Sequence, residues 1–363
     1  MRPAVSDSSA HARPEQRNIQ LDILKVIGLC CIILAHTNAP TSVINVRSFD
    51  VPLLIVISGV LFARTTGSGE IGFRDYVRKR LLRLLAPTWM FLTFFFSSVL
   101  LLVFLIKKPY PFSPNQVLSS YALLTGIGYV WIVRVFILVA LIAPLLLRIK
   151  RRLNEYQFLA ILALIYCFYE LLRRMIGPGE SLAATALVNQ ILFYLIPYGC
   201  IFGIGLCLPD LDRRAIALLI GVFVLLLGAI MLNLDAASQS LHVTEYKYPP
   251  RFYYVAYGIA VSLLLYLATS GIHISNRSVV ALIAFISSSS LWIYLWHIFV
   301  VYYWNLVSYR LLPAGGNYLV SFAVLLLLPV SVTYIQKQSI RKIIAETAFG
   351  RKHEQLMVPF FLK

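Results

Sequence analysis

Ionisable residues lie inside the first apolar stretch of the chain, in a spacing that suggests chemistry. Residues 21–37 read LDILKVIGLCCIILAHT and include Asp22, Lys25 and His36. Lys25 and His36 are eleven residues apart, so at ~100° per residue they fall within about 20° of each other on one helical face, roughly 16 Å apart along the axis. A charge inside a membrane-spanning helix costs about 2.5–3.5 kcal/mol on insertion scales, which indicates a functional site. The structural alternatives are a snorkelling Lys25, which Asp22 is close enough to pair with, and a His36 that merely ends the helix.

A carboxylate follows His36 after a short connection. Asp50 begins the next apolar stretch, FDVPLLIVISGVLF, and is expected at nearly the same depth as His36. An imidazole with a pKa near neutrality can act as a general base. A carboxylate that accepts the other ring N–H holds such an imidazole in its working orientation. His36 and Asp50 are therefore the catalytic candidates, and the alternative for Asp50 is an N-cap of the second helix.

Two arginines are candidates for anion binding. Arg80 and Arg83 lie in the basic segment 64–83, which ends YVRKRLLRLLAP and is expected to form an amphipathic cytoplasmic helix entering the third span. At a spacing of i, i+3 they share a face, and guanidinium groups bind phosphate in bidentate fashion. The segment therefore predicts a site for a phosphate-rich cytosolic ligand. The alternative is a stop-transfer charge cluster.

Two more ionisable residues lie within predicted spans. Arg134 lies roughly two turns inside the fourth span, where an arginine must face protein or water. It is a substrate-binding candidate, and the alternative is a structural partner for Glu170 or Asp50. Glu170 can pair instead with a neighbouring arginine. His297 lies among aromatic residues in SSSSLWIYLWHIFVVYYW and is expected to serve mainly in packing.

The composition identifies the class of protein that must position these residues. The chain has 363 residues, of which 60% are hydrophobic and 13% charged, whereas a soluble domain usually has ~25% charged residues. We therefore expect an all-α integral membrane protein, a single bundle of about ten transmembrane helices of roughly 17–25 residues each. The predicted spans are 20–38, 49–65, 85–106, 128–147, 156–172, 186–208, 215–233, 252–270, 288–307 and 317–336.

The distribution of positive charge predicts the orientation. With the N-terminus in the cytoplasm, 22 Lys and Arg residues fall on the cytoplasmic side and 8 on the other, which favours both termini inside. The formal net charge of +17 is explained in this way, without nucleic acid. The expected organisation is a cytoplasmic N-terminal tail over 1–18, a polytopic membrane domain over 19–336 and a basic cytoplasmic tail over 337–363. The polar first twenty residues predict no cleavable signal peptide.

Several other classes of site find no support in the sequence. The five cysteines all lie in apolar runs, so we expect small buried fillers rather than disulfides. Cysteine and histidine residues do not occur at ligand spacing, so no metal site is predicted. Nucleotide-binding glycine motifs and a GxSxG elbow do not occur.

Several segments of the chain, taken in their order along the sequence, resemble the membrane acyltransferase-3 family of bacterial carbohydrate and polysaccharide O-acyltransferases. The similarity covers roughly residues 18–337. The segments that carry it are LDILKVIGLCCIILAH, VPLLIVISGVLF, YVRKRLLRLLAP, VWIVRVFILVALIAPLL, YKYPPRFYY and SSSLWIYLWH. The family's basic residue followed by histidine falls on Lys25 and His36, and its Arg-x-x-Arg on Arg80 and Arg83. The aliphatic residues 53–57 depart from the aromatic run usual before Ser-Gly.

The resemblance implies a reaction across the bacterial inner membrane. Family members take an acyl group, commonly acetyl from acetyl-CoA, on the cytoplasmic side and deliver it to a hydroxyl of an extracytoplasmic glycan or lipid-linked sugar. His36 would be the general base or the acyl carrier, and Lys25 and Arg134 would stabilise donor phosphates or the oxyanion. A fused extracytoplasmic domain of some members has no counterpart here, which leaves open whether a glycan-assembly partner protein completes transfer. The alternatives are a glycan or lipid-intermediate flippase and a hexosamine N-acyltransferase.

Overall fold

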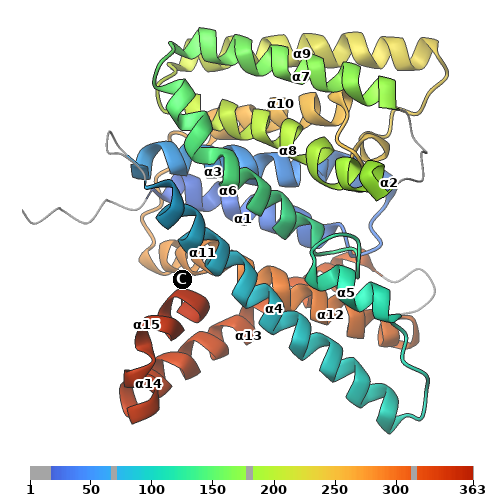
Figure 1. The fold of residues 1–363 in the computed structure, drawn as a ribbon, viewed down its shortest axis with the longest axis vertical. Coiled ribbons are helices and arrows are strands. Elements are labelled where there is room, and N and C mark those ends of the chain that lie inside the picture. The colour runs from blue at the N-terminus through green and yellow to red at the C-terminus, as the bar shows by residue number, and fades with distance from the viewer. Residues whose placement is uncertain (1–17, 67–71, 177–182, 312–316, 363) are drawn as a thin grey trace, which may run out of the picture.

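The computed structural model describes residues 18–66, 72–176, 183–311 and 317–362, and every regular element within these ranges is helical. Figure 1 shows one helical bundle in which the long helices cross at varied angles. In chain order the elements are α1 (Ile19–Leu34), α2 (Thr41–Val46), η1 (Arg47–Phe49), α3 (Asp50–Thr66), α4 (Phe73–Leu105), α5 (Pro114–Tyr121), α6 (Trp131–Lys150), α7 (Glu155–Ile176), α8 (Ala183–Cys207), α9 (Arg213–Ala236), η2 (Val243–Tyr246), α10 (Phe252–Ala268), α11 (Arg277–Ser288), α12 (Ser290–Leu311), α13 (Tyr318–Glu346), α14 (Ala348–Lys352), α15 (Glu354–Met357) and η3 (Val358–Leu362).

The all-helical prediction is confirmed for these residues, and each predicted span overlaps a helix of 16 residues or more. Seven stretches are long and apolar enough to cross a membrane; they lie in α2 to α3, α4, α6, α8, α9, α12 and α13. Among the remaining helices, α1 and α10 have only 16 and 17 residues. The count of about ten spans and the cytoplasmic position of both termini therefore stay predictions. Residues 1–17 of the expected N-terminal tail lie outside the described residues.

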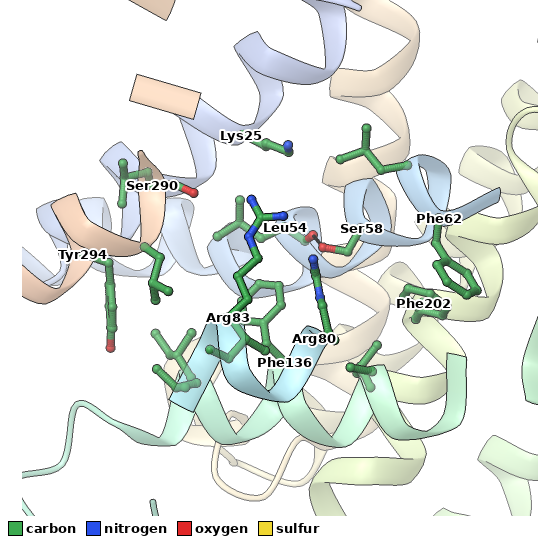
Figure 2. A pocket seen from close by; sticks show the side chains of 18 of the residues that line it. Lys25, Leu54, Ser58, Phe62, Arg80, Arg83, Phe136, Phe202, Ser290 and Tyr294 are labelled. Carbon is green, nitrogen blue, oxygen red and sulfur yellow. Dashed lines mark hydrogen bonds between the residues drawn. The ribbon is translucent and has the colours of Figure 1, made fainter. Parts of the chain in front are cut away.

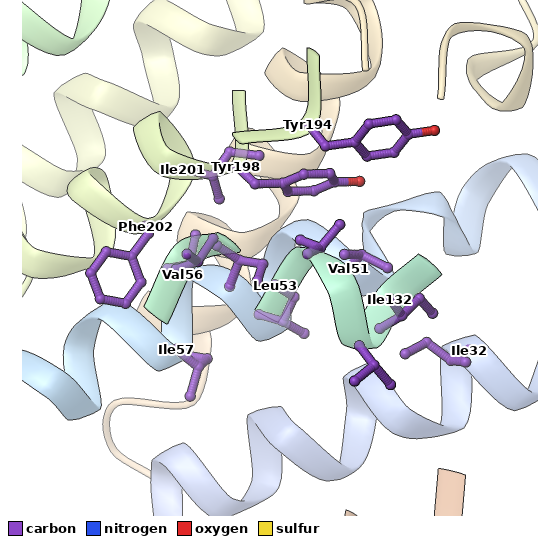
Figure 3. Close-up of a cluster of buried hydrophobic side chains, with 14 of the residues drawn as sticks. Ile32, Val51, Leu53, Val56, Ile57, Ile132, Tyr194, Tyr198, Ile201 and Phe202 are labelled. Carbon is purple, nitrogen blue, oxygen red and sulfur yellow. The ribbon is translucent and has the colours of Figure 1, made fainter. Parts of the chain in front are cut away.

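Helix α3 lies at the centre of the bundle, against α1, α8 and α10. Figure 3 shows Leu53 and Val56 of α3 packed against Tyr198 and Ile201 of α8, in a cluster that is buried throughout. The two backbones approach closely because both helices carry glycine there. A Cβ atom added at Gly59 would lie 2.4 Å from the carbonyl oxygen of Phe202. Small residues at such crossings allow the close packing that associates helices in a bilayer.

Two helices extend beyond the predicted spans. Residues 73–83 of the basic segment and the third span form one continuous helix, the 33-residue α4; residues 64–66 end α3, and residues 67–71 lie outside the described residues. Helix α13 continues past residue 336 to Glu346, and the predicted basic tail after it is largely helical. The chain then turns back against α12, where the Trp292 indole donates a hydrogen bond of 2.9 Å to the carbonyl of Phe360. This turn packs the C-terminal residues beside α4.

The cysteines bear out their prediction only in part. All five are free thiols. Cys200 and Cys207 are buried as expected, whereas Cys167 is exposed on α7, so it does not fill a gap in the core. Exposure of apolar side chains is usual at the periphery of a membrane bundle. Helix α9 shows the same feature, because only 11% of its most apolar 18-residue stretch is buried.

Candidate functional site

Two pockets follow one another along a single face of α1. The first contacts Lys25, Leu29 and Ile32, and the second contacts Ile32, Ala35 and His36. These residues recur every three or four positions, which is the spacing of one helical face. The shared face predicted for Lys25 and His36 is therefore the face on which both pockets lie.

The first cavity, which we call the arginine pocket, has a volume of about 420 Å³. Figure 2 shows Arg80 and Arg83 reaching into it from α4, on the side opposite Lys25 of α1. Among the described residues that line this pocket, none is acidic. The Arg80 Nε is buried and has no hydrogen-bond partner among the described residues. The structure thus brings together three predicted donor-binding residues, and the pocket that they line is strongly cationic.

The second cavity, which we call the histidine pocket, has a volume of about 430 Å³. Its wall combines charged and aromatic side chains from segments far apart in the chain. The lining side chains from outside α1 include Arg47, Asp50, Tyr129, Trp131, Lys247, Tyr248 and Tyr294. Both predicted catalytic residues, His36 and Asp50, line this pocket.

His36 lies among aromatic rings just beyond the last residue of α1. Its ring centroid is 5.0 Å from that of Tyr129 and 5.5 Å from that of His297. His297 is fully buried on α12, and its Nδ1 contacts the carbonyl oxygen of Tyr294. If that nitrogen carries the proton, Nε2 is left with a lone pair, and Nε2 has no partner among the described residues. His297 is packed as expected, but it is packed beside His36, which the sequence analysis did not anticipate.

Asp50 pairs with two cations in this pocket. One carboxylate oxygen lies 2.5 Å from the Arg47 guanidinium, and the other lies 3.3 Å from the Lys247 ammonium and accepts from the Val51 N–H. Burial lowers the pKa of Lys247 from its usual value, and the Asp50 carboxylate opposes this shift. The orientation of His36 by Asp50 stays a prediction, because the contacts of Asp50 described here are with these two cations and with the start of α3.

Three apolar or aromatic side chains separate the two pockets. Ile32 of α1, Ile132 of α6 and Tyr294 of α12 line both cavities. All three are largely buried, and the Tyr294 hydroxyl donates a 2.5 Å hydrogen bond to the carbonyl of Tyr129. The two cavities therefore adjoin through a narrow, mostly apolar wall.

Arg134 lies outside the lining of both pockets. Its guanidinium donates to the carbonyl oxygens of Leu123 and Leu124 at 3.2 and 3.0 Å, and it stacks on Tyr194. Neither Asp50 nor Glu170 is among these contacts. Glu170 pairs with Arg173 at 2.9 Å, and Asp50 pairs with Arg47 and Lys247. These contacts indicate that Arg134 supports the loop before α6, which forms one side of the histidine pocket. A substrate-binding role for Arg134 stays a prediction.

The sequence analysis did not identify several residues of the histidine pocket, namely Arg47, Lys247, Tyr294 and the aromatic residues Tyr129, Trp131 and Tyr248. Arg47 and Lys247 are two of the eight Lys and Arg residues expected on the outer side of the membrane, which the sequence analysis used only to predict orientation. Lys247 contacts Asp50 across 197 residues of chain, so no local spacing reveals the pair. A signal existed for Tyr294, because it precedes His297 by three positions and the two share a helical face.

Comparison with known protein families gives one match. A family model described as an acyltransferase domain, that of the acyltransferase-3 family, matches residues 18–335. This range begins one residue before α1 and ends within α13, so it includes both pockets. No curated protein matches the chain.

Proposed function

Because the chain belongs to the acyltransferase-3 family, we propose that it is a transmembrane O-acyltransferase that moves an acyl group from cytosolic acyl-CoA to a sugar hydroxyl. The favoured donor is acetyl-CoA. The favoured acceptor is an extracytoplasmic glycan or a lipid-linked sugar, and the favoured location is the bacterial cytoplasmic membrane. The observation that carries the proposal is the pair of adjoining pockets on one face of α1, cationic at one end and lined by His36 at the other.

The arginine pocket suits the phosphate groups of coenzyme A. Arg80 and Arg83 project from consecutive turns of α4 into one cavity, and Lys25 faces them from α1. Paired guanidinium groups bind phosphate oxygens with two parallel hydrogen bonds each, and such charge-assisted bonds are the stronger kind. The excess of basic residues expected at this end of the bundle agrees with a cytosolic ligand.

The acyl group then has a short route to His36. The pantetheine arm is narrow and flexible, and it would run along the face of α1 past Leu29 toward the wall formed by Ile32, Ile132 and Tyr294. A thioester held at this wall lies between the donor cavity and the histidine pocket. The apolar wall disfavours passage of the charged phosphates, while a small acyl group is compatible with its chemistry.

In this proposal His36 assists the transfer in either of two ways. As a general base, it takes the proton of the acceptor hydroxyl while that oxygen attacks the thioester carbonyl. As an acyl carrier, its ring nitrogen attacks first, and the hydroxyl then attacks the resulting acyl-imidazole. In both cases the C–S bond breaks, the thiolate of coenzyme A leaves, and a proton returns to that sulfur. Lys25 lines the arginine pocket, on the donor side of the wall, and its positive charge stabilises the bound phosphates of the donor.

Thioester consumption tests this function. Purified protein is supplied with labelled acetyl-CoA and a mixture of glycan acceptors, and both free coenzyme A and acetylated sugar are measured. We expect coenzyme A release that rises with acceptor concentration and an ester-linked product that mild base removes. An alkali-stable amide product would indicate the N-acyltransferase alternative. Intact acetyl-CoA in the presence of a protein that still moves glycan across vesicles would contradict acyl transfer and indicate a flippase.

A further inference from the structure

The histidine pocket holds more positive than negative charge. Arg47 and Lys247 are 7% and 5% exposed, and both pair with the same carboxylate, that of Asp50. The lining of this pocket includes no further acidic residue among those that the structure describes. With His36 neutral, the cluster therefore carries one formal positive charge in excess.

Unbalanced charge in a buried site is costly unless something compensates it. Moving a charged group out of water carries a large penalty, which a single shared counter-ion offsets only in part for two cations. The Arg47 Nε also lacks a hydrogen-bond partner among the described residues, although this side chain is more than nine-tenths buried. A cationic pocket with an unused donor is suited to an anionic ligand.

Aromatic side chains surround the same cations. The Lys247 ammonium lies 5.5 Å from the ring centroid of Trp131 and 5.7 Å from that of Tyr248. Both rings line the pocket, together with Tyr129 beside His36. Aromatic rings provide broad apolar surfaces with a polar edge, which are suited to the flat faces of a sugar ring. The pocket thus combines a surface for a sugar with a place for a negative charge.

We propose that the acceptor is an acidic sugar, whose carboxylate or phosphate group binds Arg47 and Lys247 while its ring packs on Trp131 and presents a hydroxyl to His36. This inference rests on the proposed acyltransferase function and narrows the acceptor class. The anion takes the excess charge of the Arg47–Asp50–Lys247 cluster. The carboxylate of a hexuronic acid and the phosphate of a lipid-linked sugar offer the same chemistry, and the experiment below separates them.

Equilibrium binding without any donor tests the proposal. Purified protein in detergent is titrated with glucuronic acid, glucose 1-phosphate or glucose at constant ionic strength, and the midpoint of thermal unfolding gives the relative affinities. We expect the wild type to bind one or both acids about tenfold or more tightly than glucose, as charge-assisted hydrogen bonds warrant. Preference for glucuronic acid identifies a uronate acceptor, and preference for glucose 1-phosphate identifies a sugar phosphate.

Three variants show whether the preference comes from this pocket. Lys247→Gln is expected to lose most of it, and Lys247→Arg is expected to keep it because the charge is retained. Arg251→Gln is the matched control, since Arg251 lies four residues further along, stacks on Tyr246 and lines a different pocket. It removes the same unit of charge from the same end of the bundle, so retained preference there excludes a bulk electrostatic effect.

Two results would overturn the proposal. One is equal affinity of the wild type for acidic and neutral sugars, which decides the matter even if Lys247→Gln fails to fold. The other is an equal loss of preference in Lys247→Gln and Arg251→Gln. Acid binding that is intact in a protein unable to consume acetyl-CoA would instead refute the acyltransferase function and leave the anion site standing, so the two failures are distinguishable.

Discussion

The two pockets on α1 differ in how their charges are balanced. In the arginine pocket, three basic side chains face a cavity whose described lining includes no acid. In the histidine pocket, two basic side chains are held by one buried carboxylate beside His36. A cavity lined by basic side chains and by no acidic residue among those described suits a ligand that brings several negative charges and then leaves. Ion pairs to a shared buried carboxylate hold the side chains in place before any ligand arrives, as a reacting centre requires, and leave one positive charge for that ligand.

The two pockets also differ in where their residues come from. Arg80 and Arg83 are one turn apart on α4, and three of the residues that line the arginine pocket lie on α1. The charged residues of the histidine pocket are Arg47 of η1, Asp50 of α3 and Lys247 of the loop before α10, and its remaining wall includes residues of α1, the loop before α6, α6 and α12. The pairing of Arg80 with Arg83 thus follows from local helical spacing, whereas the charged cluster of the reacting centre, like the cavity around the arginines, depends on the packing of the whole bundle.

The largest effect is expected at the reacting centre. His36→Ala should lower acyl transfer by about 10²–10⁴-fold, the usual loss when a general base is removed, or by more if His36 carries the acyl group. Binding of acetyl-CoA should persist, because His36 lies outside the arginine pocket. Steady-state transfer and donor titration on the same preparation measure the two quantities.

His297 supplies the comparison within the same pair of histidines. His297→Phe keeps an aromatic ring in the fully buried position but removes Nε2, so we expect it to lose much less transfer than His36→Ala. A dead His297→Phe beside a nearly normal His36→Ala would move the chemistry from the end of α1 to α12. Both proteins must elute as folded particles for the comparison to count.

A smaller effect is expected at the donor end. The double variant Arg80→Gln/Arg83→Gln should have a KM for acetyl-CoA about tenfold or more above that of the wild type. Each charge-assisted hydrogen bond that it loses contributes ~1.5–3 kcal/mol. The rate at saturating donor should change far less, since neither residue lines the histidine pocket. An unchanged KM in a folded double variant would leave the pair as a stop-transfer cluster.

The wall between the pockets should affect the choice of acyl group. Ile132→Val removes one methylene where the cavities adjoin, so the turnover of propionyl-CoA relative to acetyl-CoA should rise. We expect a rise of roughly tenfold, the lower end of the discrimination between substrates that differ by one methylene in a hydrophobic pocket. Ile142→Val is the matched control, because Ile142 lies on the same helix but packs toward Gly199 of α8. An equal shift in both variants would show that the wall does not select.

The smallest effect on donor binding is expected at Arg134. Arg134→Met leaves the Leu123 and Leu124 carbonyls without their donor, so the free energy of unfolding should fall by about 1–3 kcal/mol. The KM for acetyl-CoA should stay within twofold of the wild type. A large rise in that KM without loss of thermal stability would instead restore the substrate-binding role that the sequence suggested.

The sequence reveals the parts of this molecule that depend on local spacing. Hydropathy predicts where the long helices lie because each apolar stretch is contiguous in the chain, and the eleven-residue interval places Lys25 and His36 on one face. The contact between Asp50 and Lys247 joins residues 197 positions apart, and the contact between His36 and His297 depends on how α1 meets α12. Helix packing creates such contacts, and no periodicity within a single helix encodes them.

In the proposed reaction, one protein binds the donor at one membrane surface and delivers its acyl group at the other. Proteoliposomes with the protein in a single orientation test it most directly. Labelled acetyl-CoA is supplied only on the side where accessibility labelling places Arg80, and acceptor sugar is supplied on one side at a time. We expect acetylated sugar to form only when the acceptor is on the opposite side. If acetylated sugar forms only when the acceptor and acetyl-CoA are on the same side, transfer across the membrane is contradicted.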